Sequence, residues 1–240
     1  MVISHKHKYL FVELPRTGST AISKELRRYY DGATFLRKHT TFLEFLKVAS
    51  PEEKKYFVFS TIRNPLDDIV SLYFKYKTDH DKKYTDPVEL NRRGPLVRYV
   101  DLLRFNSIQK NSLDFAVYFK RFHKIPYGNW SILSHKNFDF ILHFENLQND
   151  FARVLELLDI EAQRPLPVVN KTGEKADFVS YYTPDIYGHA RRVCGPFMKM
   201  WGYSFPAEWG DNSVPLLSQV AFHFINPFRI AYWKHLRRRI

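Results

Sequence analysis

The stretch ELPRTGSTAI, residues 13–22, lies between an apolar run that predicts a strand over residues 8–14 and a periodic pattern that predicts a helix over residues 19–30. A strand, a tight loop and a helix form the first half of a βαβ unit. In a parallel α/β sheet, ligands bind beyond the carboxyl ends of the strands, where helix N-termini present unpaired N–H groups. The stretch therefore predicts both a parallel sheet and an anion site at its edge.

The residue types in this loop suit a phosphate cradle. Gly18 allows the backbone to approach an anion closely, and Arg16 supplies a fixed cation. Thr17, Ser19 and Thr20 offer hydroxyl groups. The same residues can equally form an ordinary strand-to-helix turn with an N-cap. The loop is not the GxxxxGK[ST] loop of nucleoside triphosphatases, because no lysine follows the glycine.

A second strand-loop-helix unit follows. Residues 56–62 predict a strand, and a helical pattern begins after Arg63, Asn64 and Pro65. Asn64 and Pro65 are explained by the start of a helix. The start of a helix does not explain Arg63, at the end of the strand, or Ser71, about two turns into the helix. Both of these residues can face one anion.

The rest of the chain continues the alternation of strands and helices. We expect helices over residues 40–48, 148–158 and 184–200, and a strand over residues 138–144. This predicts an α/β fold of three layers, in which helices flank a central parallel sheet and form a P-loop-like nucleotide-binding core. At 240 residues we expect one domain, with a helical insertion at 79–125 on the acceptor side and a basic, aromatic tail at 206–240.

The composition predicts that the chain folds and that its binding partners are anionic. Hydrophobic residues make up 45% of it, and 37 Lys and Arg against 25 Asp and Glu give a net charge of +12. The single Cys194 cannot form an internal disulfide, which favours a reducing compartment. The chain shows no signal peptide and no run of 18 or more apolar residues, so we expect a cytoplasmic protein, with membrane association through the tail left open.

Four segments together resemble the sulfotransferases that use 3′-phosphoadenosine 5′-phosphosulfate (PAPS). LFVELPRTGSTAI is similar to the 5′-phosphosulfate loop of that family, and FSTIRNPLDDIVSLY is similar to its 3′-phosphate motif. FILHFENLQNDFARVLELLDI resembles a later strand-Glu-Asn-Leu-helix segment, and VVNKTGEKADFVSYYTPD with FMKMWGYSF resembles the C-terminal loop and ending. The resemblance covers most of the chain outside residues 79–135 and the tail.

The resemblance implies a set of donor-binding residues. Those matching the family's motifs are Arg16, Thr17, Gly18, Ser19, Thr20, Ala21, Arg63 and Ser71, with Lys171 and Lys175 in the loop that closes over the nucleotide in relatives. Many members carry a lysine where Arg16 stands. The arginine keeps the positive charge but lacks the mobility of a lysine side chain. PAPS is the implied co-substrate and adenosine 3′,5′-bisphosphate the product, with no metal required.

Sulfuryl transfer to a hydroxyl also needs a base for the acceptor proton and charge stabilisation at the leaving phosphate. We expect His39 to be the base, because imidazole titrates near neutrality and several family members carry a catalytic histidine or glutamate after the first helix. Glu44 is the second candidate, and Arg16 is expected to stabilise the leaving group. His39 can also be an ordinary surface histidine.

The expected activity is transfer of a sulfuryl group from PAPS to a hydroxyl, or an amine, of a carbohydrate, glycolipid or tyrosyl peptide by in-line displacement. Two other classes stay open: a Mg²⁺-dependent nucleotide or nucleoside kinase, and a non-catalytic basic protein that binds acidic polymers. We expect no nucleic-acid partner. The tail, with Lys234 and Arg237 to Arg239, can lie on an anionic membrane or end a packed helix with a solvated basic terminus.

Overall fold

The computed structural model describes residues 1–129, 138–167, 177–232 and 235. These residues divide into two compact units, the first comprising Met1–Asn64 and Gly128–Glu174 and the second Pro65–Tyr127 and Lys175–Ile240. Each unit is described by itself. The single domain expected from the chain length stays a prediction, because two compact units can belong to one functional domain.

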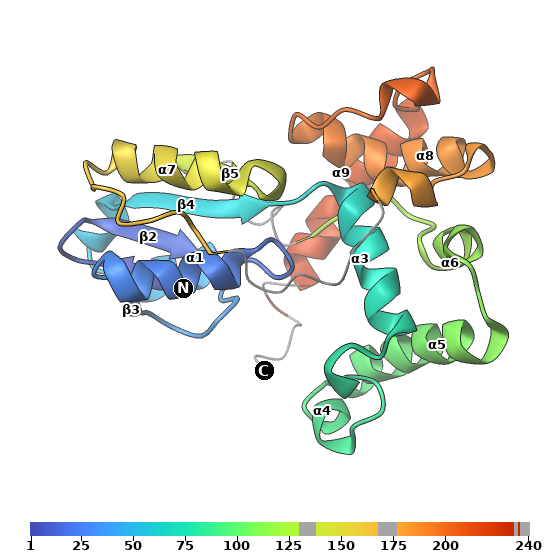
Figure 1. The fold of residues 1–240 in the computed structure, drawn as a ribbon, viewed down its shortest axis with the longest axis horizontal. Helices are drawn as coiled ribbons and strands as arrows, with labels where there is room; N and C mark the ends of the chain where they lie inside the picture. Colours follow the sequence, from blue (N-terminus) through green and yellow to red (C-terminus); the bar gives the residue numbers. More distant parts are fainter. Residues whose placement is uncertain (130–137, 168–176, 233–234, 236–240) are drawn as a thin grey trace. The chain divides into compact units, whose positions relative to one another are not determined.

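The first unit contains a five-stranded sheet of order β3-β1-β2-β4-β5 (Figure 1). Its strands are β1 (Val2–Ser4), β2 (Tyr9–Val12), β3 (Ala33–Thr34), β4 (Phe57–Ile62) and β5 (Phe140–His143). β2, β4 and β5 run parallel, with Leu10 opposite Val58 and Ser60 opposite Ile141. β1 pairs antiparallel with both β2 and β3. The α/β class and the parallel central strands are confirmed, while the whole sheet is mixed.

Helices cover both faces of this sheet. They are α1 (Ser19–Tyr29), α2 (Phe42–Val48) and α7 (Leu147–Leu157). Successive side chains of a strand point to opposite faces, so Tyr9 and Phe11 pack in one core with α1 and α7, whereas Leu10 and Val12 pack in another with α2. Because β2 is buried on both sides, it reads as a continuous apolar run. The three expected layers are present.

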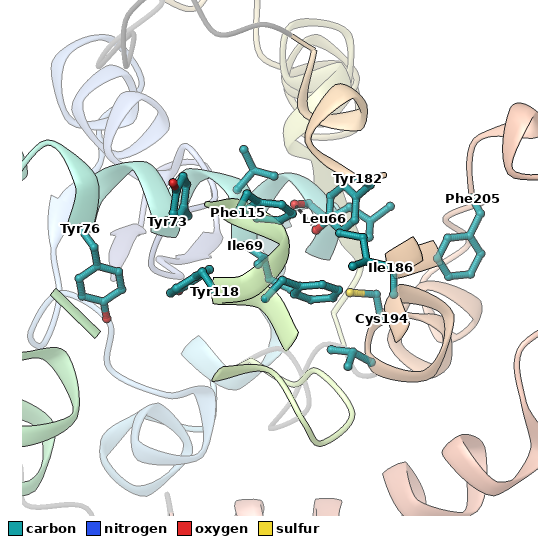
Figure 2. Packing of buried hydrophobic residues seen from close by; sticks show 14 of the residues in the cluster. Leu66, Ile69, Tyr73, Tyr76, Phe115, Tyr118, Tyr182, Ile186, Cys194 and Phe205 are labelled. Atoms are coloured by element: carbon teal, nitrogen blue, oxygen red, sulfur yellow. Dashed lines mark hydrogen bonds between the residues drawn. The ribbon is translucent and has the colours of Figure 1, made fainter. Parts of the chain in front are cut away.

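The second unit is helical. It contains α3 (Pro65–Lys77), α4 (Pro87–Asn91), α5 (Pro95–Asn111), α6 (Phe115–Phe122), α8 (Pro184–Met200) and α9 (Leu216–Ala231). Figure 2 shows its aromatic core, in which Tyr73 of α3, Phe115 of α6 and Ile186 of α8 belong to one cluster of buried side chains. The expected insertion at 79–125 is helical as predicted, and α5 and α6 pack against α3. Cys194 is buried in this core, away from any disulfide partner.

No helix in the described part of the chain combines the length and apolar content needed to cross a membrane.

Candidate functional site

The loop between β2 and α1 is closed by its own side chains. The hydroxyl groups of Thr17 and Ser19 both donate to the carbonyl oxygen of Leu14, at 3.0 and 2.6 Å. Arg16 and Gly18 have positive φ angles of 65° and 75°. This left-handed backbone turns the chain sharply from the end of the strand into the helix. The loop therefore has a defined shape that does not depend on a ligand.

The loop leaves the N-terminus of α1 suited to an anion. Gly18 is the N-cap residue and has no side chain to cap the helix, and the first turn of α1 contains no acidic residue. The first backbone N–H groups of a helix have no partner within the helix, and the helix dipole adds a partial positive charge there. A Cβ atom at Gly18 would lie 3.0 Å from Leu147 Cδ2 and 3.1 Å from Phe144 Cδ2. Glycine is therefore required both by the backbone angle and by the space.

Arg63 links the ends of three strands. It follows β4, and its Nη1 donates to the carbonyl oxygen of Arg16, 3.1 Å away. Its guanidinium lies 4.3 Å from the ring centroid of Phe144, which follows β5. The hydroxyl of Thr61, on β4, hydrogen-bonds the hydroxyl of Thr17. The predicted loop residue Arg16 and the predicted phosphate ligand Arg63 thus lie together at the carboxyl ends of the parallel strands.

Glu145 has a structural partner in this region. Its Oε1 accepts a 2.7 Å hydrogen bond from the backbone N–H of Asn64. The carboxylate therefore joins the segment after β5 to the segment after β4, which positions Arg63 beside it.

The segment of residues 35–41 reaches the same loop. Nδ1 of His39 lies 3.0 Å from the carbonyl oxygen of Glu13, and Nζ of Lys38 donates to Oγ1 of Thr20, 3.0 Å away. Leu36 and His39 both have positive φ angles. Non-glycine residues adopt this conformation only where the surrounding structure demands it, and such residues gather at functional sites. The structure thus brings the predicted base to the predicted anion loop.

The hydrogen bond of His39 decides its tautomer. A carbonyl oxygen can only accept, so Nδ1 of His39 must carry the proton and Nε2 carries the lone pair in the neutral ring. Burial lowers the pKa of His39 below its ordinary value of 6.5, and the nearby charge of Lys38 acts in the same direction. Neutral His39 at pH 7 is a proton acceptor through Nε2.

Glu44 has a different position from the one expected of a base. It is the N3 residue of α2, and its Oε2 accepts from the backbone N–H of Thr41 at 2.8 Å, while the Thr41 hydroxyl accepts from the backbone N–H of Glu44. This reciprocal pair is a capping box, which stabilises the start of the helix. The carboxylate is engaged in the helix start, and His39 is the stronger candidate.

The remaining predicted residues are spread over the chain. Ala21 lies in the first turn of α1 and its N–H bonds the Gly18 carbonyl at 3.0 Å. Ser71 is buried on α3, in the second unit. Lys171 and Lys175 lie outside the described residues.

Three residues of the site were missed in the sequence. Lys38 directly precedes His39 in the sequence, and its charge next to the predicted base was a usable signal. Thr61 lies on the same strand face as Phe59, so strand alternation could have identified it as an inward residue at the end of β4. Nothing in the sequence around Phe144 indicates a role in the site, because only the folded sheet brings its ring against the guanidinium of Arg63.

Within residues 1–129, 138–167, 177–232 and 235, no group of three or more His, Cys, Asp or Glu side chains could hold a metal ion.

Comparison with known proteins gives one match. A family model described as "Sulfotransferase family" matches residues 1–194, which is most of the chain. No curated protein matches, and no solved structure matches. The matched range includes the β2–α1 loop, the segment of His39 and the segment of Arg63.

Proposed function

Because the chain belongs to the sulfotransferase family, whose members use PAPS as the sulfuryl donor, we propose that the β2–α1 loop binds the 5′-phosphosulfate of PAPS. The observation that carries this proposal is the meeting of three segments at the N-terminus of α1: the loop itself, Arg63 and His39. The family assignment favours sulfuryl transfer over the kinase and the non-catalytic binding protein that the sequence left open.

The donor is held mainly by backbone N–H groups and cations in this proposal. The hydroxyl hydrogens of Thr17 and Ser19 donate to Leu14, so these residues contribute their N–H groups and the shape of the loop. Gly18 and Ala21 contribute backbone only. Arg63 donates one hydrogen bond to the Arg16 carbonyl, and the planar fork of its guanidinium has the geometry that binds a phosphate in a bidentate manner.

Ser71, Lys171 and Lys175 complete the proposed donor set. Ser71 is assigned to the 3′-phosphate together with Arg63, on the spacing of the two residues in the motif. Lys171 and Lys175 are assigned to the nucleotide through the family resemblance alone. Single substitutions of the three residues would measure their contributions separately.

The proposed reaction is an in-line displacement at sulfur. An acceptor hydroxyl attacks the sulfur atom, and the bond from sulfur to the bridging phosphate oxygen breaks with its electron pair moving to the 5′-phosphate. Nε2 of His39 takes the acceptor proton, since Nδ1 already carries one. Arg16 and the N-terminus of α1 stabilise the negative charge on the departing phosphate.

Lys38 supplies a second cation in this proposal. Relatives of the chain often carry a mobile lysine at the position of Arg16, and here the ammonium of Lys38 lies 3.0 Å from the hydroxyl of Thr20 in the first turn of α1. A lysine side chain is flexible and can follow the sulfuryl group as it moves, whereas a guanidinium is planar and rigid. Arg16 and Lys38 together can serve where one lysine serves in relatives.

The acceptor is proposed to be a hydroxyl, or an amine, of a carbohydrate, glycolipid or tyrosyl peptide. The net charge of +12 favours an anionic acceptor. The second unit offers aromatic and cationic side chains, including a surface hollow of about 400 Å³ on α5 whose lining includes Tyr99 and Lys110. Aromatic faces stack on sugar rings and phenols, which supports the 79–125 segment as the acceptor side.

Thermal unfolding with adenosine 3′,5′-bisphosphate tests the donor site. A ligand at about 100 times its Kd stabilises a protein by about 2.7 kcal/mol, so Tm should rise by several degrees in EDTA-containing buffer. Arg16→Ala and Arg63→Ala should each remove most of this rise. Arg28→Ala, which removes the same charge from an exposed position of α1, should keep it.

A flat response to millimolar ligand would overturn the donor site. A response that requires Mg²⁺ and a nucleoside triphosphate would instead indicate a kinase. With the donor site established, screening of acceptors with labelled PAPS identifies the acceptor class.

A further inference from the structure

Helix α9 has an exposed apolar face. Leu217, Val220, Phe224 and Phe228, at helical spacing, are 83%, 58%, 69% and 64% exposed. We call these four side chains the α9 outer face. A water-facing helix surface normally carries polar and charged residues. Two exposed phenylalanines one turn apart, with ring centroids 5.5 Å apart, are therefore unusual.

The opposite face of α9 is more polar than the outer face. The buried residues of α9 are Ser218, Phe222 and Asn226, and α9 packs against α8 (Figure 1). The helix thus buries a serine and an asparagine beside Phe222 and exposes two other phenylalanines. This is the reverse of the pattern that folding alone would select, and an exposed apolar patch of this kind marks an interaction surface.

Positive charge lies on α8 beside α9 and follows α9 along the chain. Lys199 of α8 donates through Nζ to Oε1 of Gln219, 3.0 Å away. In the sequence, α9 is followed within eight residues by Lys234, Arg237, Arg238 and Arg239. Apolar side chains next to clustered cations fit a surface that is apolar inside and anionic outside, which is a bilayer with acidic headgroups.

The same charges disfavour a second copy of the chain as the occupant. Two copies meeting through this face would bring two basic tails together, and each chain carries a net charge of +12. An anionic bilayer gains from each of these cations, whereas a dimer is repelled by them.

We propose that the α9 outer face lies on an anionic membrane surface. The helix has 16 residues and is therefore about 24 Å long at 1.5 Å per residue, and it lies in the plane of the interface. Leu217, Val220, Phe224 and Phe228 enter the boundary between headgroups and acyl chains. This placement would hold the enzyme next to lipid-linked or membrane-bound acceptors.

Vesicle co-sedimentation with the full chain tests the proposal. We expect binding to phosphatidylcholine vesicles that contain about 30 mol % phosphatidylserine, weaker binding to phosphatidylcholine alone, and release by salt. Phe224→Ser combined with Phe228→Ser should reduce binding at least about tenfold, since each exposed ring contributes its buried apolar area to the membrane. Leu217→Gln, at the other end of the helix, should weaken binding in the same direction.

A matched control separates the outer face from general surface hydrophobicity. Val88 on α4 is 60% exposed, so Val88→Ser removes a comparable exposed side chain and should leave vesicle binding unchanged. The outer-face variants should keep the wild-type Tm and the Tm rise with adenosine 3′,5′-bisphosphate, so a failure of the donor site would not affect this test.

Three results would overturn the proposal. Equal binding to neutral and anionic vesicles would remove the role of charge. A concentration-dependent dimer that the Phe224 and Phe228 variant abolishes would make a second copy the occupant. A lower Tm in the outer-face variants, with no change in vesicle binding, would mean that the protein itself covers this face.

Discussion

The acid–base role proposed for His39 rests on a single backbone contact. The Glu13 carbonyl accepts the Nδ1 proton, so the lone pair of the neutral ring is on Nε2. The contact also ties the base to the residue that opens the β2–α1 loop, which places the proton acceptor and the proposed donor site in one unit. Glu44, the second candidate for the base, is part of a helix cap, because Thr41 and Glu44 have the spacing of a capping box.

Replacing His39 should remove catalysis and leave donor binding intact. His39→Gln should lower kcat by about 10²- to 10⁴-fold, the usual contribution of a general base. The Tm rise with adenosine 3′,5′-bisphosphate should persist. His7→Gln, which removes a histidine paired with Asp31 in the same unit, should leave kcat unchanged. Equal loss of kcat and of the Tm rise in His39→Gln would assign His39 a structural role.

The pH dependence of kcat/KM follows from the pKa of His39. Protonated imidazole cannot accept the acceptor proton, so activity is lost as pH falls through the folded-state pKa. Burial lowers that pKa, so the acid limb should have its midpoint below 6.5. A midpoint above 6.5, measured at saturating donor, would contradict this assignment.

At the scale of elements, the strand-to-helix turn that we propose as the donor site owes its shape to one glycine. Gly18 combines a φ of 75° with a neighbouring Leu147 side chain only 3.0 Å from where a Cβ atom would lie, so a larger residue would have to push that side chain aside. The turn leads directly into the uncapped first turn of α1. Shape and electrostatics of the site therefore depend on the same residue.

Gly18→Ala should be more damaging than Gly202→Ala. Both glycines have a φ near 70°, at 75° and 72°, so both variants should lose about 1–2 kcal/mol for an L-residue in the left-handed region. Only the Gly18 variant also meets close atoms, whereas nothing lies within 4 Å of a Cβ at Gly202. Urea unfolding should show a larger loss for Gly18→Ala, and only this variant should lose affinity for adenosine 3′,5′-bisphosphate. Equal effects on both measures would contradict the role of the turn.

At the scale of the whole molecule, the excess of positive charge does not help folding. A net charge of +12 destabilises a compact chain by self-repulsion, and anionic ligands offset that repulsion. The charge is therefore expected to be retained for its partners, namely the anionic donor, the acceptor and the proposed membrane surface.

Salt should discriminate between acceptors. Raising the ionic strength from about 0.1 M to about 1 M shortens the Debye length from about 10 Å to about 3 Å. At saturating donor, KM should rise for an anionic acceptor and change little for a neutral one, with kcat nearly constant for both. Steady-state kinetics with a matched pair of sulfated and unsulfated glycans measures this, and an equal change in both KM values would exclude charge as the basis of acceptor choice.

Most of the fold could be predicted because buried strands and amphipathic helices have recognisable local sequence patterns, namely apolar runs and helical periodicity. β2, β4 and β5 appear as apolar runs, and α8 begins and ends where its pattern predicts. β1 and β3 have three and two residues, too few for any alternation; β1 pairs with the edge of β2, and β3 pairs with β1. The mixed character of the sheet was therefore invisible in the sequence.

By itself the sequence determined the chemistry at the two strand ends: an arginine, a glycine and small residues in the first turn, and an arginine in the second. These are local properties, set by residue type and by spacing along the chain. Only the tertiary structure decided that Arg63 holds the Arg16 carbonyl, that His39 carries its proton on Nδ1, and that α9 exposes its apolar side. Each of these depends on contacts between residues distant in sequence, or on which face a neighbouring element covers, and no local pattern carries that information.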